Sequence, residues 1–241
     1  MPQPRAILFD YGNTLVPFGP AEVRRCDDHF CELLSSRFGA FDRQQFNLLR
    51  MEQRLRPYRT DDWAENNAHE TSQELFACLY GRPASPQETA LVVSDRQRTF
   101  VDAVQAPDDL FPVLEALRGR FRLGLVSNFP CGESIRQSLH RTGLAEFLEA
   151  VVVSGDIGFV KPHPLPFSTI LGQMNLAAHE AVFVGDNWLA DIQGANRHGL
   201  RSVWYRRWEP PEHFPKQPGD SDPHHEITHL NDLVRLLAEV P

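Results

Sequence analysis

Three short apolar runs along the chain are each followed directly by polar or turn-forming residues. The runs cover residues 5–9 (RAILF), 121–126 (FRLGLV) and 181–184 (AVFV). Their length and β-branched content predict buried strands. Apolar residues at helical spacing in 110–117 and 167–174 separate the later strands. This alternation of strands and helices predicts an α/β fold with a Rossmann-like, doubly wound parallel sheet, in which ligands bind at the carboxyl ends of the strands.

The stretch from residue 17 to residue 106 has a different pattern. Its apolar residues recur at helical spacing, and it contains no convincing strand. We therefore expect an all-helical inserted domain at 17–106 and an α/β core formed by 1–16 and 107–241. Beyond Arg206, a proline-rich stretch predicts a long surface loop, followed by a short strand and a last amphipathic helix.

Composition narrows the class of protein. The 241 residues are 41% hydrophobic and 23% charged, near the averages for globular proteins, so a disordered or coiled-coil chain is excluded. The net charge of -8 argues against nucleic acid as a partner. Neither a leader nor a bilayer-spanning run is present, so we expect no membrane partner and a cytoplasmic location. The spacing of the four cysteines indicates reduced thiols.

Four separated motifs supply carboxylates, a lysine and hydroxyl groups. They contain Asp10 in DYGNTL, Ser127 in SN, Lys161 in VKP and Asp186 in GDNWLAD. The carboxylates of Asp10 and Asp186 are hard oxygen ligands that suit Mg2+. Lys161 and the hydroxyl groups of Thr14 and Ser127 can neutralise and hydrogen-bond phosphoryl oxygens. Because these residues follow different strands, the sequence predicts one site for a metal and an anionic substrate.

In the order and spacing of these motifs, the chain resembles the haloacid dehalogenase-like (HAD) hydrolase superfamily, in the subgroup with a helical cap inserted after the first motif. The resemblance implies that Asp10 is a nucleophile that forms an aspartyl-phosphate, and that Lys161 balances the charge of nucleophile and phosphate. It assigns the phosphoryl group to Thr14, Ser127 and the backbone of Asn128. It assigns Mg2+ to Asp10, Asp186 and the carbonyl of Gly12, with Asp191 as a further ligand or as a residue that holds one. The implied function is Mg2+-dependent hydrolysis of a small phosphorylated metabolite.

One residue departs from the family's pattern. Phosphatases of the superfamily normally carry a second aspartate, the general acid and base, two residues after the nucleophile; this chain has Gly12 there. Gly12 can offer its carbonyl oxygen to a metal but cannot transfer a proton, a loss that typically costs on the order of 100-fold to 10,000-fold in rate. Asp27, Asp28 and His29 are candidates for a substitute acid, although each has the residue type of a solvated helix position.

Gly12 leaves two alternatives to the phosphatase. The first alternative is a metal-independent 2-haloacid dehalogenase, because dehalogenases of the superfamily also lack the second aspartate. Asp186 and Asp191 favour the magnesium-dependent branch instead, because the ion offsets their negative charge. The second is a catalytically weakened protein that binds a phosphate ligand, against which the nucleophile Asp10 argues. The phosphonate-cleaving branch uses a cap lysine, and residues 17–106 contain none.

Other polar and aromatic residues have ordinary explanations. Arg24 and Arg25 are expected to be solvated on a helix. The three histidines near the end of the chain lack cysteines or acids at ligand spacing, which favours a surface cluster over a metal site (His224, His225 and His229). Trp188, inside the fourth motif, is expected to pack against the cap or the substrate leaving group.

Overall fold

The computed structural model describes residues 3–207 and 214–238, and within them the chain forms a six-stranded parallel sheet. The strand order is β3-β2-β1-β4-β5-β6. The strands are β1 (Ala6–Phe9), β2 (Arg122–Ser127), β3 (Ala150–Val153), β4 (Ala181–Gly185), β5 (Arg201–Tyr205) and β6 (His225–Ile227). The chain runs outward from β1 on both sides, so the doubly wound parallel sheet is confirmed.

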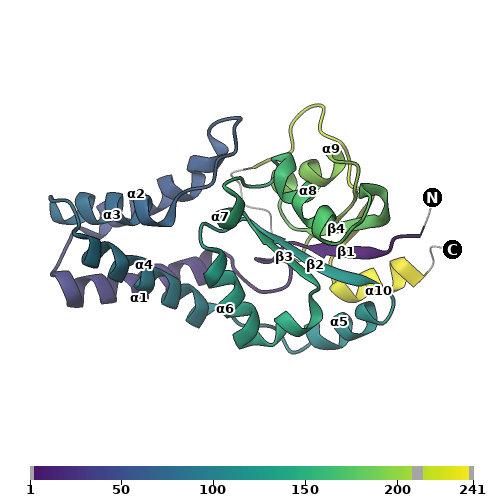
Figure 1. The fold of residues 1–241 in the computed structure, drawn as a ribbon, viewed down its shortest axis with the longest axis horizontal. Coiled ribbons are helices and arrows are strands. Elements are labelled where there is room, and N and C mark those ends of the chain that lie inside the picture. The colour runs from purple at the N-terminus through teal and green to yellow at the C-terminus, as the bar shows by residue number, and fades with distance from the viewer. Residues whose placement is uncertain (1–2, 208–213, 239–241) are drawn as a thin grey trace.

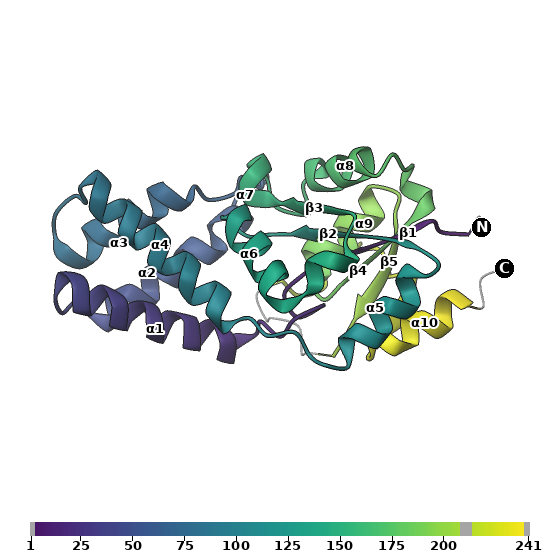
Figure 2. The ribbon, with the colours of Figure 1, turned by 60° about the horizontal axis from the view of Figure 1, so that its bottom comes forward.

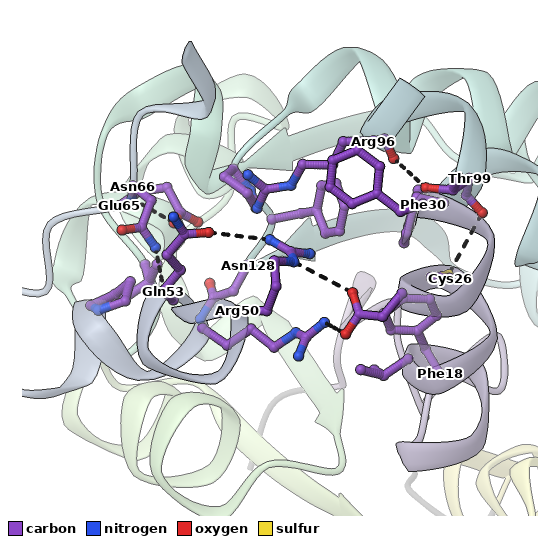
Figure 3. A pocket seen from close by; sticks show the side chains of 18 of the residues that line it. Phe18, Cys26, Phe30, Arg50, Gln53, Glu65, Asn66, Arg96, Thr99 and Asn128 are labelled. Atoms are coloured by element: carbon purple, nitrogen blue, oxygen red, sulfur yellow. Dashed lines mark hydrogen bonds and ion pairs between the residues drawn. The ribbon is translucent and has the colours of Figure 1, made fainter. Parts of the chain in front are cut away.

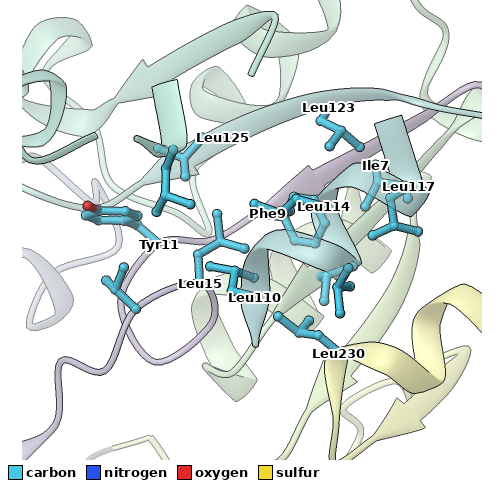
Figure 4. Packing of buried hydrophobic residues seen from close by; sticks show 14 of the residues in the cluster. Ile7, Phe9, Tyr11, Leu15, Leu110, Leu114, Leu117, Leu123, Leu125 and Leu230 are labelled. Atoms are coloured by element: carbon cyan, nitrogen blue, oxygen red, sulfur yellow. The ribbon is translucent and has the colours of Figure 1, made fainter. Parts of the chain in front are cut away.

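Helices cover both faces of the sheet (Figure 2). One face carries α5 (Leu110–Arg118), α6 (Gly132–Thr142) and α10 (Leu230–Ala238), and the other carries α8 (Pro164–Gln173) and α9 (Gly194–Arg197). Side chains of β1 alternate between the two faces, because successive residues of a strand point in opposite directions. Ile7 and Phe9 pack with Leu114 of α5 (Figure 4), whereas Ala6 and Leu8 belong to the opposite cluster. The core therefore holds β1 rigidly at the centre of the sheet.

Most predicted elements of the core are confirmed. The three predicted strands correspond to β1, β2 and β4, and the predicted helices at 110–117 and 167–174 correspond to α5 and α8. The pattern did not predict β3, β5 or the short helix α7 (Ser154–Ile157). Residues 208–213 of the expected loop, and the end of the last helix, lie outside the described residues. No helix in the described part of the chain is long and apolar enough to cross a bilayer; the cytoplasmic location stays a prediction.

A helical region lies between β1 and β2, as the pattern predicted. It contains α1 (Pro20–Phe38), α2 (Arg43–Leu55), α3 (Ala68–Tyr80) and α4 (Pro86–Ala103), with a 3-10 turn, η1 (Arg56–Tyr58), after α2. Side-chain oxygens of Asp42, Asn67 and Ser85 cap the amino ends of α2, α3 and α4. These helices bury their own cluster around Phe30 and Phe46, and they extend from the sheet on the side opposite both chain ends (Figure 1). The domain boundaries 1–16, 17–106 and 107–241 stay a prediction.

Candidate active site

The loop after β1 presents Asp10 at the middle of the sheet edge. The backbone N–H groups of Leu15 and Val16 donate to the Tyr11 carbonyl at 2.9 and 3.1 Å, which closes a tight turn. Asn13 takes a φ of 57° in this turn, in the left-handed region where asparagine is enriched. Thr14 Oγ1 donates to Asp10 Oδ2 at 3.5 Å, so the turn brings the Thr14 hydroxyl beside the carboxylate.

Lys161 is the buried cation of the site, with its side chain only 1% exposed. Its Nζ donates to Asp10 Oδ1 at 2.7 Å, to Asp191 Oδ1 at 2.7 Å and to the Val126 carbonyl at 2.8 Å. These three acceptors match the three N–H groups of an ammonium. Burial acts to lower the pKa of Lys161, but the charges of Asp10 and Asp191 outweigh it and raise that pKa. Lys161 therefore stays charged against Asp10.

Asp191 uses both of its carboxylate oxygens within the protein. Oδ1 accepts from Lys161, and Oδ2 accepts from the Asn187 N–H at 2.9 Å. Residue 185 must be glycine for this arrangement, since a Cβ there would lie 2.3 Å from Asp191 Oδ2. Asp191 lies within a π-helical segment, η4 (Trp188–Gln193). Burial raises the pKa of Asp191 to about 6, although Lys161 opposes the shift.

Asp10, Asp186 and Asp191 form a cluster in which one ligand atom of each lies within 4.8 Å of the others. Burial, followed by repulsion from the other two carboxylates, raises the pKa of Asp186 well above its ordinary value. Three carboxyl groups around one lysine leave an excess of negative charge. Carboxylate oxygens are the donors that Mg2+ prefers, so the cluster fits a divalent cation.

Asn128 connects the loop that carries Lys161 to the inserted helices. Its Oδ1 accepts from the Lys161 N–H at 2.8 Å, and its Nδ2 donates to the Lys161 carbonyl at 3.0 Å. The same Nδ2 donates to the Tyr58 hydroxyl at 2.9 Å. Burial raises the pKa of Tyr58, which keeps this hydroxyl protonated. Sequence reasoning missed Tyr58, because no motif spacing relates η1 to the end of β2.

The structure thus brings together the side chains that the motifs singled out. Asp10, Lys161 and Asp191 are in direct contact, Thr14 touches Asp10, and Asp186 lies in the same carboxylate cluster. Ser127, at the end of β2, is 5% exposed. The catalytic, substrate-binding and metal roles given to these residues, and to Gly12 and Asn128, stay predictions.

No side chain at position 12 can transfer a proton, and the space beside it is occupied. A Cβ on Gly12 would meet the Cβ of Phe18 at 3.3 Å. Of the candidate substitute acids, Asp28 and His29 are exposed, whereas Asp27 is buried and ion-paired to two arginines. None of the three is a free acid beside Asp10 in the described structure.

The remaining sequence expectations have mixed outcomes. Trp188 contacts the core, since its Nε1 donates to Asp220 at 2.7 Å and its ring packs edge-on against Trp204. The expectation that it packs against the cap or the substrate leaving group stays a prediction. His224 accepts from the Ser202 N–H at 3.2 Å. Within residues 3–207 and 214–238, the aspartate cluster is the one group of three or more acids, histidines or cysteines that lie close enough together to hold a metal. All four cysteines are free thiols, as expected (Cys26, Cys31, Cys78 and Cys131).

A cavity of about 370 Å³ lies between the inserted helices and the strand ends. Its volume is in the range of small-molecule sites. Asn128 and Asn187 line it from the core, and Tyr58 and Glu65 line it from the insert. Burial raises the pKa of Glu65, which accepts from the Ser154 hydroxyl at 2.5 Å. The cavity therefore extends from the loops of the carboxylate site into the insert.

Comparison with known proteins identifies a family and several similar chains. The family model described as haloacid dehalogenase-like hydrolase matches residues 44–205. The chain is 31% identical to the glyceraldehyde 3-phosphate phosphatase of Methanopyrus kandleri over 175 residues. This matched region covers 71% of this chain and 73% of that one.

Two solved structures share the fold over almost their whole lengths. The 2-haloacid dehalogenase from Pseudomonas syringae pv. Tomato DC3000 is 23% identical with a TM-score of 0.76, covering 99% of this chain and 100% of that one. The HAD-hydrolase YfnB from Bacillus subtilis, solved bound to magnesium, is 23% identical with a TM-score of 0.70, covering 98% and 99%.

Proposed function

The chain belongs to the haloacid dehalogenase-like hydrolase family, and on that basis we propose that it is a Mg2+-dependent phosphatase of a small phosphorylated metabolite. The observation that carries the proposal is the cluster of Asp10, Asp186 and Asp191, two of which pair with the buried cation Lys161. A relative that is named a phosphatase, and a structural neighbour solved with magnesium, support it.

Asp10 Oδ2 is the nucleophilic atom in this proposal. Lys161 occupies Oδ1 at 2.7 Å, whereas Oδ2 has a long contact of 3.5 Å with Thr14. The Oδ2–phosphorus bond forms as the bond to the leaving oxygen breaks, which gives an aspartyl-phosphate; water then attacks the phosphorus and releases phosphate and Asp10. The hydroxyl groups of Thr14 and Ser127 and the N–H of Asn128 donate to the phosphoryl oxygens.

The metal ligands in the proposal are Asp10, Asp186 and the carbonyl of Gly12. A bound Mg2+ supplies positive charge that offsets the phosphoryl oxygens in the transition state. We assign Asp191 to the positioning of Lys161, because its Oδ1 accepts from the ammonium while the Asn187 N–H fixes its Oδ2. Asp191 then keeps the ammonium directed at Asp10 when an anionic substrate enters.

Gly12 sets the substrate preference that we propose. Without a proton donor at this position, the leaving oxygen departs as an anion or takes its proton from elsewhere. Acyl and aryl phosphates, whose leaving groups are weakly basic, then react faster than alkyl phosphates. We also propose that residues 17–106 act as a cap over the core formed by 1–16 and 107–241, and that substrate enters when the cap opens.

A 2-haloacid dehalogenase is the second candidate function. Gly12 and the fold shared with the Pseudomonas syringae enzyme favour it. In that reaction Asp10 displaces halide and forms a carboxylic ester. The carboxylates of Asp186 and Asp191 weigh against it, because without a metal they would repel the carboxylate of a haloacid.

The discriminating experiment measures phosphate release from acyl, aryl and alkyl phosphates, with Mg2+ or with a chelator, for the wild type and Asp10→Asn. We expect release that needs both Mg2+ and Asp10 and that is fastest for acyl and aryl phosphates. Halide release from 2-chloropropionate in the presence of chelator would establish the dehalogenase instead. Binding of phosphate esters without any product would identify the weakened binding protein.

A further inference from the structure

The cavity between the insert and the strand ends is lined by three arginines. Arg50 and Arg54 come from α2, and Arg96 comes from α4 (Figure 3). Two carboxyl groups, Asp27 and Glu65, line the same space. Because the arginines outnumber the carboxyl groups, the charged side chains that line the cavity are net positive, whereas the whole chain carries a net charge of -8.

Arg96 has no carboxylate to neutralise it. One of its amino groups donates to Thr71 Oγ1 at 3.0 Å, and no ion pair joins it to an acid among the described residues. By contrast, Arg98 on the same helix pairs with Asp95 at 2.9 Å while its side chain is 50% exposed. The other N–H groups of Arg96 are therefore available to the cavity.

Arg50 is also incompletely satisfied, although it is only 8% exposed. Its contacts with Asp27 and with Gln53 are both long, at 3.4 Å. Asp27 is held more closely by Arg54, at 2.5 Å. The Asp27 carboxylate thus accepts hydrogen bonds from two guanidinium groups, and the bond from Arg50 is the longer and weaker one.

Glu65 attracts Arg96 electrostatically, but no ion pair joins the two side chains in the described structure. Burial raises the pKa of Glu65, and it accepts a hydrogen bond from the Ser154 hydroxyl, which leads away from the arginines toward the core. Burial, together with the charges of Arg50 and Arg54, lowers the pKa of Arg96 to about 9. Arg96 still carries its proton at neutral pH, and its charge lacks both full hydration and a paired anion.

We propose that Arg96 and Arg50 bind a second anionic group of the substrate, a carboxylate or a second phosphate, while the phosphoryl group that is removed lies at Asp10. A planar guanidinium donates two parallel hydrogen bonds to either group, which suits this role. The inference rests on the proposed function and narrows its substrate class to phosphorylated acids or bisphosphates. The cavity borders the site, since Asn128, which bonds to the backbone of Lys161, and Asn187, which follows Asp186 in the chain, both line it.

The test compares phosphorylated hydroxyalkanoic acids of increasing chain length with their neutral primary amides and with the matching bisphosphates. The amide keeps the size of the acid and removes its charge. We expect kcat/KM to be about tenfold to a hundredfold higher for the acid or the bisphosphate of the fitting length than for the amide, the range expected of a charged hydrogen bond. Whichever anion is preferred identifies the second group.

Arg96→Gln should remove most of this preference by raising KM for the acid or the bisphosphate. Arg96→Lys, which keeps the charge and loses the paired geometry, should restore part of it. Arg98→Gln is the matched control on the same helix and should keep the full preference. Thermal unfolding of each variant identifies any loss that comes from misfolding.

The failure of this inference is distinct from failure of the proposed function. Equal kcat/KM for acid and amide, with hydrolysis that still needs Asp10, would overturn the second anion site and leave the phosphatase. A preference that survives in Arg96→Gln and in Arg50→Gln would also overturn it. If no ester is hydrolysed, calorimetric titration of the wild type with the acid and with the amide tests the second anion site. Tighter binding of the acid than of the amide, lost in Arg96→Gln, would support the site. Equal binding of the two would refute it.

Discussion

The Cβ of Phe18 lies 3.3 Å from the point at which a side chain on residue 12 would begin. Phe18 therefore occupies space that a general acid at this position would need, and it packs edge-on against Phe100 in the wall of the cavity. The absence of a side chain at Gly12 and the position of the Phe18 Cβ are two parts of one local arrangement.

We predict that Gly12→Asp combined with Phe18→Gly, which removes the Cβ that a side chain at residue 12 would meet, raises turnover of alkyl phosphates about tenfold or more, because a positioned acid typically contributes at least 100-fold and part of this is lost to imperfect placement. Gly12→Asp alone should gain less, since Phe18 must move to admit it. Steady-state rates with alkyl and aryl phosphates check this. Aryl phosphates should change little, and a uniform effect on both esters would contradict the account.

The two acids of the fourth motif should respond differently to removal of charge. Asp186→Asn should weaken Mg2+ activation strongly, because it removes a proposed ligand. Asp191→Asn should mainly lower kcat, because it loosens Lys161 while leaving the proposed ligands in place. Titration of activity with Mg2+ separates the effects. Equal losses of Mg2+ affinity in the two variants would show that Asp191 is also a ligand.

The chain contains two lysines, which provide a matched comparison of stability. Lys161→Met should destabilise the fold by about 3–5 kcal/mol, since it leaves Asp10 and Asp191 buried without their cation. Lys216→Met removes an exposed pair with Asp222 and should cost less than about 1 kcal/mol. Denaturant unfolding without metal measures both. Similar values would argue that Lys161 contributes no specific stabilisation.

Mg2+ should stabilise the protein more above pH 6 than below it. Burial raises the pKa of Asp191 to about 6 and that of Asp186 well above its usual value, so the metal-free folded chain binds protons more tightly than the unfolded chain. Its stability then falls as pH rises through these pKa values, and Mg2+, which binds the ionised acids, offsets that loss. The rise in Tm on adding Mg2+ measures the effect, and a rise that is equal or larger in acid would contradict it.

The sequence was sufficient to predict the strand ends that carry the site. Apolar runs end just before Asp10, Ser127 and Asp186. Because parallel strands bring their carboxyl ends to one edge of the sheet, the local pattern alone predicts that these three side chains lie close to one another. β3 escaped prediction although Ala150–Val153 is an apolar, largely β-branched run of the same length as the run 181–184, from which β4 was predicted.

The residues contributed by the insert could not be predicted in the same way. Tyr58, Glu65 and Arg96 reach the cavity through contacts between distant parts of the chain, since α4 packs against α1, α3 and the core helix α6, and α2 packs against α3. In the sequence, Arg96 is one arginine among many on a helix. Only its burial without a carboxylate distinguishes it from Arg98.

Acid-quenched mass spectrometry of the protein during turnover tests the central claim most directly. With Mg2+ and an acyl or aryl phosphate, we predict a phosphoryl group on the peptide that contains Asp10, absent with chelator and absent in Asp10→Asn. Rapid turnover without any adduct on this peptide, a phosphoryl group on another residue, or an Asp10 ester formed from 2-chloropropionate without metal would contradict the assignment of the chain as an aspartyl-phosphate phosphatase.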